Sequence, residues 1–240
     1  MPKLKTHPET QIDEIAPDIY RISTGVSDIA GGFSFNRYLI KDDAPLVFHT
    51  GPRRLFEATR DAIETVMPAH RLRYIAFSHF EADECGALNE FLAVAHDAVP
   101  VCSGVGAMTS IGDIADRTPS VMTDGATLNL GRHELRWLDT PHLPHGWDCG
   151  YFFDTTSRTL FCGDLFTQPG SDTPALTERD ILEPSEAMRG MFDYFAHGRD
   201  TGALIEKMAA TQPKTLACMH GSAWTGDGAG LLRELAKRIA

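Results

Sequence analysis

The sequence predicts an α/β protein in which two β-sheets lie between outer helices. A β-rich opening is followed by strand, helix and strand, then by a second β-rich stretch, and finally by a strand flanked by helices. The composition, 42% hydrophobic and 23% charged, is ordinary for a globular protein. The 240 residues fit one large domain or two modest ones, and neither a repeat nor a long linker divides them.

The first half of the chain alternates apolar strand-type segments with helical spacing. Early strands are expected at residues 19–22, 36–40 and 44–51. From Pro52 the apolar residues recur at helical spacing through Val66, and Pro52 suits the first position of a helix. The following elements are expected in the order strand, helix, strand, at residues 72–77, about 87–95 and 99–102.

The second half of the chain is expected to begin with a β-meander at residues 120–140, with turns at Asp124-Gly125 and Gly131-Arg132. A hairpin should join residues 150–154 to 159–163. Residues 167–184, rich in Pro, Ser, Asp and Thr, are expected to form a loop. The last elements are a strand at 215–219 and helices at 185–195, 202–211 and 228–239.

Charge and composition exclude several classes of protein. A net charge of −11 without a basic stripe argues against a nucleic-acid or anionic-membrane partner. No segment approaches the roughly 20 apolar residues of a membrane helix, and residues 1–9 lack the apolar core of a signal peptide. Five cysteines without a C-x-x-C pair indicate reduced thiols, most of them small core residues. We therefore expect a cytoplasmic protein.

A group of polar residues follows the strand expected at 72–77. His79, Glu81, Asp83 and Glu84 lie within six residues of one another. Three neighbouring acids repel one another unless a cation holds them. This segment therefore predicts a metal site.

Three further ligand-type residues stand beside glycines near strand ends. They are His145 before Gly146, Asp164 after Gly163, and His220 before Gly221. In α/β folds the carboxyl ends of strands hold functional sites, because the strand fixes the backbone and the loop frees the side chain. A single histidine at such a place is more often structural, so the argument depends on the set.

The four segments together resemble a known family. The H-x-E-x-D pattern at His79, Glu81 and Asp83 resembles the metallo-β-lactamase superfamily, and within it the flavodiiron proteins and the stand-alone oxygen-binding diiron proteins. Residues 140–148, 159–166 and 218–224 resemble that family's later motifs, and the similarity runs from about Ile15 to Trp224. The resemblance implies a metallo-β-lactamase-like αββα four-layer sandwich, with residues 1–240 forming a single diiron domain.

The resemblance also implies a ligand set. His79, Glu81 and His145 would hold one metal, while Asp83 and His220 would hold the other, with Asp164 bridging the two. His142 is a rival for His145, which is preferred because Gly146 lets the chain turn and Asp148 follows three residues later.

Two positions depart from the family pattern. Glu84 stands where the family usually has histidine, and could bind metal, accept a hydrogen bond from a ligand, or point away. His49 stands where the superfamily often has aspartate, and could hydrogen-bond a ligand or serve the fold alone.

The donor set favours iron. Three histidines and three carboxylates are harder and more anionic than the histidine-rich sites of zinc hydrolases, which favours iron. The resemblance implies two Fe ions with an oxo or hydroxo bridge. Zn or Mn remain alternatives. Four aromatic side chains could line a dry pocket for a diatomic molecule or simply pack in the core: Phe80, Trp147, Phe166 and Trp224.

Three functions are compatible with such a centre. The first is a non-haem diiron protein that binds O2 or NO, as a sensor with a signalling partner or as a reductase with an external electron donor. The second is a dinuclear metallohydrolase of a thioester, lactam or phosphoester, using metal-bound hydroxide. The third is a metal-binding superfamily member without turnover. No FMN phosphate loop appears before Ala240, so no flavodoxin domain is expected, and a homodimer is expected by analogy with the family.

Overall fold

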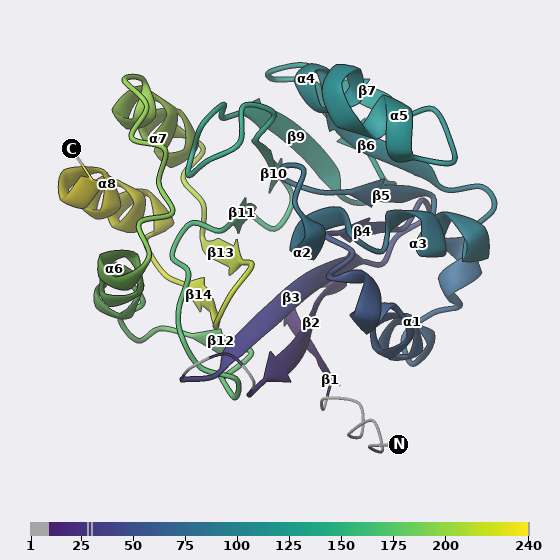
Figure 1. Ribbon diagram of the computed structural model, residues 1–240, viewed down its shortest axis with the longest axis horizontal. Coiled ribbons are helices and arrows are strands. Elements are labelled where there is room, and N and C mark those ends of the chain that lie inside the picture. The colour runs from purple at the N-terminus through teal and green to yellow at the C-terminus, as the bar shows by residue number, and fades with distance from the viewer. Residues whose placement is uncertain (1–9, 28, 30, 240) are drawn as a thin grey trace.

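The computed structural model describes residues 10–27, 29 and 31–239, and in them two seven-stranded sheets pack between helices. Figure 1 shows the layers side by side: helices α6, α7 and α8, then one sheet, then the other sheet, then helices α1 and α3. The predicted αββα four-layer sandwich is therefore confirmed. The absence of a signal peptide, expected from residues 1–9, lies outside the described residues.

The first sheet runs in chain order from β1 to β7. Its strands β1 to β4 are antiparallel, and β4 to β7 are parallel, since helices connect them. The strands are β1 (Thr10–Ala16), β2 (Ile19–Val26), β3 (Phe33–Ile40), β4 (Leu46–Phe48), β5 (Tyr74–Ala76), β6 (Val99–Ser103) and β7 (Ser120–Met122). The helices on its outer face include α1 (Phe56–Glu64), which follows the 3-10 turn Arg53–Leu55, and α3 (Leu88–Val94).

The second sheet has the order β12-β14-β13-β11-β10-β9-β8. Its strands are β8 (Thr127–Asn129), β9 (Glu134–Asp139), β10 (Gly150–Asp154), β11 (Thr159–Gly163), β12 (Leu176–Thr177), β13 (Thr215–Cys218) and β14 (Ala223–Thr225). Strands β11 and β13 are parallel, because α6 (Leu182–Met191) and α7 (Thr201–Ala210) carry the chain back between them. The helix α8 (Gly228–Ile239) completes the outer layer.

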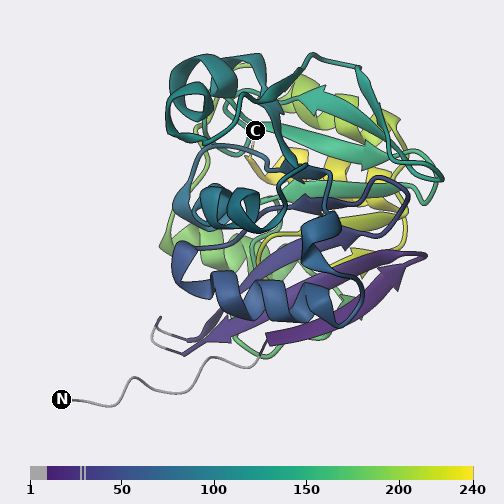
Figure 2. The same cartoon turned by 90° about the vertical axis from the view of Figure 1, so that its right-hand side faces the viewer.

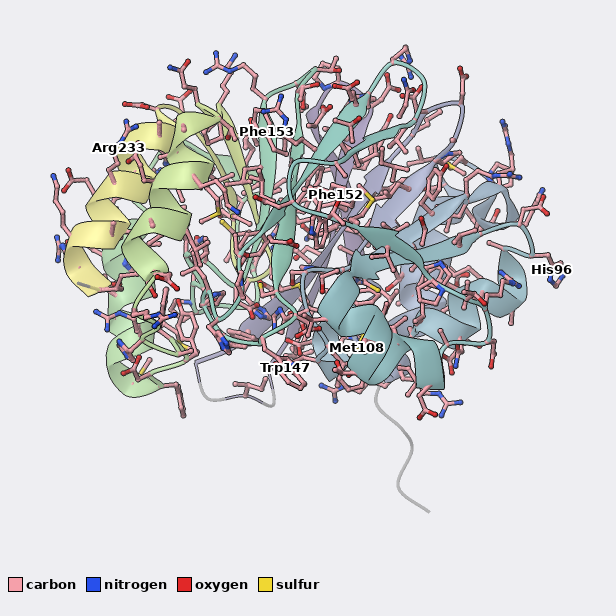
Figure 3. All side chains as sticks on the ribbon, turned by 90° about the horizontal axis from the view of Figure 1, so that it is seen from above. His96, Met108, Trp147, Phe152, Phe153 and Arg233 are labelled. Carbon is pink, nitrogen blue, oxygen red and sulfur yellow. The ribbon has the colours of Figure 1, made fainter. Side chains whose placement is uncertain are left out.

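Side chains of alternating direction build three apolar layers. Phe152 and Phe161 pack between the sheets, together with Phe48 from the first sheet. Their neighbour Phe153 points the opposite way, into the layer beneath α6 to α8, as expected for a strand. Figure 2 shows α1 against the outer face of β1 and β2, and Figure 3 labels Phe152 and Phe153 within the second sheet.

The long elements agree with the sequence prediction, but several short ones do not. The prediction of a single meander at 120–140 is wrong. Strand β7 pairs with β6 in the first sheet, whereas β8 and β9 form a hairpin in the second. The Asp124-Gly125 turn is thus the crossover between the sheets. Strand periodicity cannot show which sheet a strand will join, because both sheets offer an apolar inner face.

The prediction of a loop at 167–184 is also partly wrong. It contains β12, and α6 begins at Leu182, three residues before its expected start at Ser185. The Asp180 carboxylate accepts a hydrogen bond from the backbone N–H of Leu182 at 2.8 Å, which satisfies a free donor in the first turn. Strands β1 and β14 and the short helix α2 (Ala82–Cys85) were not predicted.

No helix among residues 10–27, 29 and 31–239 combines the length and apolar character needed to cross a membrane. The five cysteines are all buried free thiols, as expected for small core residues.

Candidate metal centre

The loops that follow four strands meet at one edge of the two sheets. His79 follows β5, His145 lies in the loop after β9, and Asp164 and His220 follow β11 and β13. Since β11 and β13 are parallel, their carboxyl ends lie at the same edge. The short helix α2 begins just after Glu81 and carries Asp83 back toward this edge, where its carboxylate meets His220.

Four of the gathered residues form what we call the first half-site: His79, Glu81, His145 and the Oδ2 atom of Asp164. The Nε2 atom of His145 lies 3.2 Å from Glu81 Oε1 and 3.3 Å from Asp164 Oδ2. The Nε2 atom of His79 lies 3.7 Å and 3.5 Å from the same two oxygens. All four donor atoms therefore face one small volume.

The second half-site consists of Asp83, His220 and the Oδ1 atom of Asp164. The Nε2 atom of His220 lies 3.3 Å from Asp164 Oδ1 and 3.5 Å from Asp83 Oδ2. Because its two oxygens face different histidines, the Asp164 carboxylate joins the two half-sites.

These contacts fit metal binding better than hydrogen bonding. Donor atoms about 2.1 Å from one shared ion lie about 3.0–3.4 Å from each other, close to the separations seen here. The buried Nε2 atoms of His79 and His145 and the Oδ1 atom of Asp164 have no hydrogen-bond partner among the described residues. Buried polar atoms left in this way are rare, and an ion would satisfy all three together.

The electrostatics keep two of the carboxylates ionised. The neighbouring His145 and His79 lower the pKa of Glu81 to about 2. Burial by itself raises the pKa of Asp164, but the contact with His220 and the two other histidines outweigh it and hold the pKa below its usual range. These two residues are therefore anionic donors at neutral pH.

Each histidine is oriented by a bond at its other ring nitrogen. The Nδ1 atom of His145 lies 2.7 Å from the backbone oxygen of Tyr194, and that of His220 lies 2.8 Å from the backbone oxygen of Ser34. Both bonds require an N–H at Nδ1, which leaves Nε2 free to bind a cation. Sequence reasoning missed both partners, because a backbone oxygen from a distant loop carries no sequence signal.

His49 reaches the centre through a hydrogen-bonded serine. The Nε2 atom of His49 lies 3.0 Å from the Ser78 hydroxyl, which lies 2.9 Å from Nδ1 of His79. Burial lowers the pKa of His49 to about 3, so the ring is neutral and can accept the serine proton. Of the two roles expected for His49, the contacts match the first, because His49 reaches the candidate ligand His79 through the hydroxyl of Ser78. Ser78 was missed, although it immediately precedes His79 at the strand end.

The loop from residue 140 to 149 presents His145 and not its rival. His142 is exposed and belongs to none of the clusters of ligand-type side chains found among the described residues. Gly146 has a φ of +74°, and a Cβ there would lie 3.2 Å from the Cβ of His79, so the close approach of the two segments requires glycine. Asp148 accepts a hydrogen bond from the backbone N–H of Phe80 at 2.9 Å and so ties this loop to the segment of His79.

Glu84 points inward and is fully buried. Its ligand atoms lie within 4.8 Å of those of His79 and Asp164, and it also groups with Glu81 and Asp83. Burial, followed by the charge of Asp164, raises the pKa of Glu84 well above its usual value. The alternative in which this residue points away is therefore wrong.

The aromatic residues do not enclose a common dry pocket. Phe80 and Trp147 are 43% and 57% exposed, and Figure 3 shows Trp147 at the outer edge of the molecule. Phe166 is fully buried in the core beneath α6 to α8, and Trp224 packs against the same core. The core-packing alternative thus describes the last two, whereas Phe80 lines a cavity of about 490 Å³ beside Glu81.

Comparison with known proteins places the chain in a family. A putative diflavin flavoprotein of Thermosynechococcus vestitus is 28% identical over 65% of this chain and 28% of its own length. The rubredoxin-oxygen oxidoreductase of Megalodesulfovibrio gigas is 24% identical over 81% of this chain and 50% of its own. The chain thus spans half or less of the length of these relatives.

A solved structure agrees with the assignment at the level of the fold. The metal-soaked Flv1 flavodiiron core of Synechocystis sp. PCC6803 covers 98% of this chain and 61% of its own, with 22% identity and a TM-score of 0.84. The family model described as "ODP family beta lactamase" matches residues 33–221, which include every residue of both half-sites. The resemblance to the flavodiiron branch of the metallo-β-lactamase superfamily is thereby confirmed, and the chain belongs to the ODP family of beta-lactamase-type proteins.

Proposed function

We propose that this chain is a non-haem diiron protein that binds O2, or NO as the second choice, and reduces it with electrons from an external donor. The observation that carries the proposal is the single Asp164 carboxylate facing histidines of both half-sites, His145 at 3.3 Å and His220 at 3.3 Å. A carboxylate shared in this way suits two ions that must change oxidation state together. When bound, a pair of ferrous ions supplies two electrons to one diatomic molecule.

The donor set supports iron over zinc. Each half-site combines histidine with anionic oxygen, and the carboxylates of Glu81 and Asp83 give each of the two ions a carboxylate of its own besides Asp164. Hard anionic donors favour iron or manganese in their higher oxidation state, whereas neutral histidines would leave a zinc ion acidic enough to ionise water. The relative named a rubredoxin-oxygen oxidoreductase supports oxygen chemistry over hydrolysis.

The residues of the centre also define an open side. The side chains of Glu81, Asp83 and His145 are 49%, 26% and 24% exposed, whereas those of His79 and Asp164 are almost completely buried. A small molecule would therefore enter past Glu81 and His145. A cavity of about 490 Å³ lies next to Glu81 between Phe80 and residues of α2 and α3, and among the described residues of the two half-sites only Glu81 lines it.

Metal analysis combined with optical spectroscopy tests the proposal. We expect protein purified without oxygen to hold two irons per chain and to develop a new absorption band when air is admitted. Addition of NO to the reduced protein should give an absorption spectrum that differs from the spectrum in air. Two zinc ions, no spectral response to air and hydrolysis of a thioester would instead identify a metallohydrolase and overturn the proposal.

A further inference from the structure

The carboxylate of Glu84 is buried without a partner. Its side chain is 0% exposed, and neither Oε1 nor Oε2 accepts a hydrogen bond from the part of the chain that the structure describes. The backbone at this residue is held firmly, since its carbonyl oxygen accepts the N–H of Thr50 at 2.7 Å. A buried carboxylate with two unsatisfied oxygens is strongly destabilising unless a cation lies beside it.

The neighbours of Glu84 are ligand-type side chains from both half-sites. Its ligand atoms lie within 4.8 Å of those of His79 and Asp164 in one cluster, and of those of Glu81 and Asp83 in another. Three of these four neighbours are carboxylates, so the protein itself adds repulsion at this point. The acid must therefore either take up a proton or lie beside positive charge, and a cation in the centre supplies that charge.

The two half-sites differ in how many donors they already have. The first half-site has His79, Glu81, His145 and one oxygen of Asp164, whereas the second has two side chains and the other Asp164 oxygen. Glu84 lies near both half-sites, since its cluster partners are His79, Glu81, Asp83 and the shared Asp164, so the number of donors and not the position of Glu84 distinguishes them. The second half-site is therefore the one with room for a further donor.

We propose that Glu84 is a ligand of the metal ion in the second half-site, alongside Asp83, His220 and Asp164. The inference rests on the proposed two-metal centre and adds a donor to it. Four carboxylates then surround the two ions: Glu81, Asp83, Glu84 and Asp164. Their charge balances two divalent cations, so the loaded centre is neutral and its burial costs less.

The neutral centre has a consequence for the redox chemistry. A fourth anionic oxygen stabilises the higher oxidation state more than a histidine at the same position would. Replacing Glu84 by an uncharged residue should therefore raise the reduction potential of the loaded centre. It should also make the ferrous protein slower to oxidise in air.

The variant Glu84→Gln separates a ligand from a merely buried acid. We expect wild-type protein incubated with Fe2+ without oxygen to retain two irons per chain after desalting, and the variant to retain about one. Without metal the variant should unfold at a higher temperature than the wild type, because it no longer buries an acid among other carboxylates, which must either hold a charge or take up a proton. With metal it should unfold at a lower temperature, so the sign of the difference reverses.

A matched control and a second variant keep the test decisive. Glu186→Gln changes a mostly buried glutamate of α6 that pairs with Arg189 and belongs to neither half-site, and should alter neither metal content nor the sign of the stability difference. Glu84→Asp keeps the charge on a shorter side chain, and should keep the second iron but bind it more weakly. It also serves if the glutamine variant fails to fold.

Two results distinguish failure of the Glu84 assignment from failure of the proposed function. If Glu84→Gln retains two irons with unchanged affinity and reduction potential, the residue is not a ligand and the inference fails alone. If the wild type itself holds fewer than two irons, or two zinc ions that do not respond to air, the proposed function fails first.

Discussion

The two half-sites use the same residue types but differ in how firmly the fold holds them. In the first, His79 is fixed through Ser78 to the buried ring of His49, and His145 through its Nδ1 to the backbone oxygen of Tyr194. In the second, His220 alone has such a bond. Asp83, on the four-residue helix α2, has no hydrogen bond that fixes its carboxylate within the described chain.

Residue type therefore does not distinguish the two half-sites, whereas donor number and preorganisation do. A site whose donors are held in place loses less entropy when an ion binds. The first half-site should therefore bind its ion more tightly, and the second should depend more on charge, which is the part we assign to Glu84. Single substitutions test this difference between the two half-sites.

The largest effect should come from Asp164→Asn, which changes the one residue that both half-sites share. Its Oδ2 atom faces His145 at 3.3 Å and its Oδ1 atom faces His220 at 3.3 Å. Loss of the negative charge should reduce the metal content from about two ions per chain to well below one. Elemental analysis after desalting measures this directly.

Asp193→Asn provides the control for that variant. Asp193 is an exposed residue paired with His197, and its replacement should leave the metal content unchanged. Retention of two tightly bound ions by Asp164→Asn would show that the carboxylate does not join the half-sites.

A smaller, selective effect is expected for Glu81→His, which alters only the first half-site. The change replaces an anionic oxygen donor by a neutral nitrogen donor, as in histidine-rich zinc sites. When iron and zinc compete for the protein, the ratio of bound iron to bound zinc should fall about tenfold or more in the first half-site. An unchanged ratio would mean that Glu81 does not determine the choice of metal.

The sequence predicted most of the long elements, and the six predicted ligand-type side chains lie together in the structure. The helix at 228–239 and the hairpin strands at 150–154 and 159–163 have the expected bounds, because regular periodicity and turn residues are local signals. His79, Asp164 and His220 could be grouped because each directly follows a strand.

The remainder depends on contacts between distant parts of the chain. The two-residue strand β12 exists because it pairs with β14 about 47 residues later, and neither segment shows a pattern of its own. Likewise, the burial of Glu84 beneath the centre follows from the docking of α2, which its charged sequence does not predict. The carbonyl groups of Ser34 and Tyr194 act through the backbone, so their side chains carry no signal.

Ser78→Ala should weaken the first half-site while leaving the second intact. Without the hydroxyl, Nδ1 of His79 and Nε2 of His49 each lose the partner that Ser78 provides. Partners of metal ligands typically contribute about 10–100-fold in metal affinity, so titration should show that decrease for one ion only. Ser23→Ala, which changes a buried serine on β2 that belongs to neither half-site, is the control. Equal weakening of both ions would indicate a general loss of structure and not the loss of this relay.

The smallest expected effect concerns a buried histidine and carboxylate that form no metal site. His133 Nδ1 lies 2.9 Å from Asp154, whose oxygens also accept the backbone N–H groups of Thr156 and Ser157. In contrast to the centre, every acceptor here has a donor, so no cation is required. The bond to Asp154 raises the pKa of His133 above its usual value.

This pair should therefore respond to pH and not to metal. Because the pKa of His133 is higher in the folded than in the unfolded state, its stabilisation is complete below the unfolded value of about 6.5 and disappears as pH rises through the folded pKa. His133→Gln keeps a neutral donor but cannot titrate. The wild type should exceed it in free energy of unfolding by about 1–2 kcal/mol at pH 6, and the gap should close as pH rises through that folded pKa. Denaturant unfolding of both proteins across this range, without metal, measures the difference, and parallel pH curves would contradict the assignment. Because both proteins share the same centre, its titration affects them equally, and the difference isolates His133.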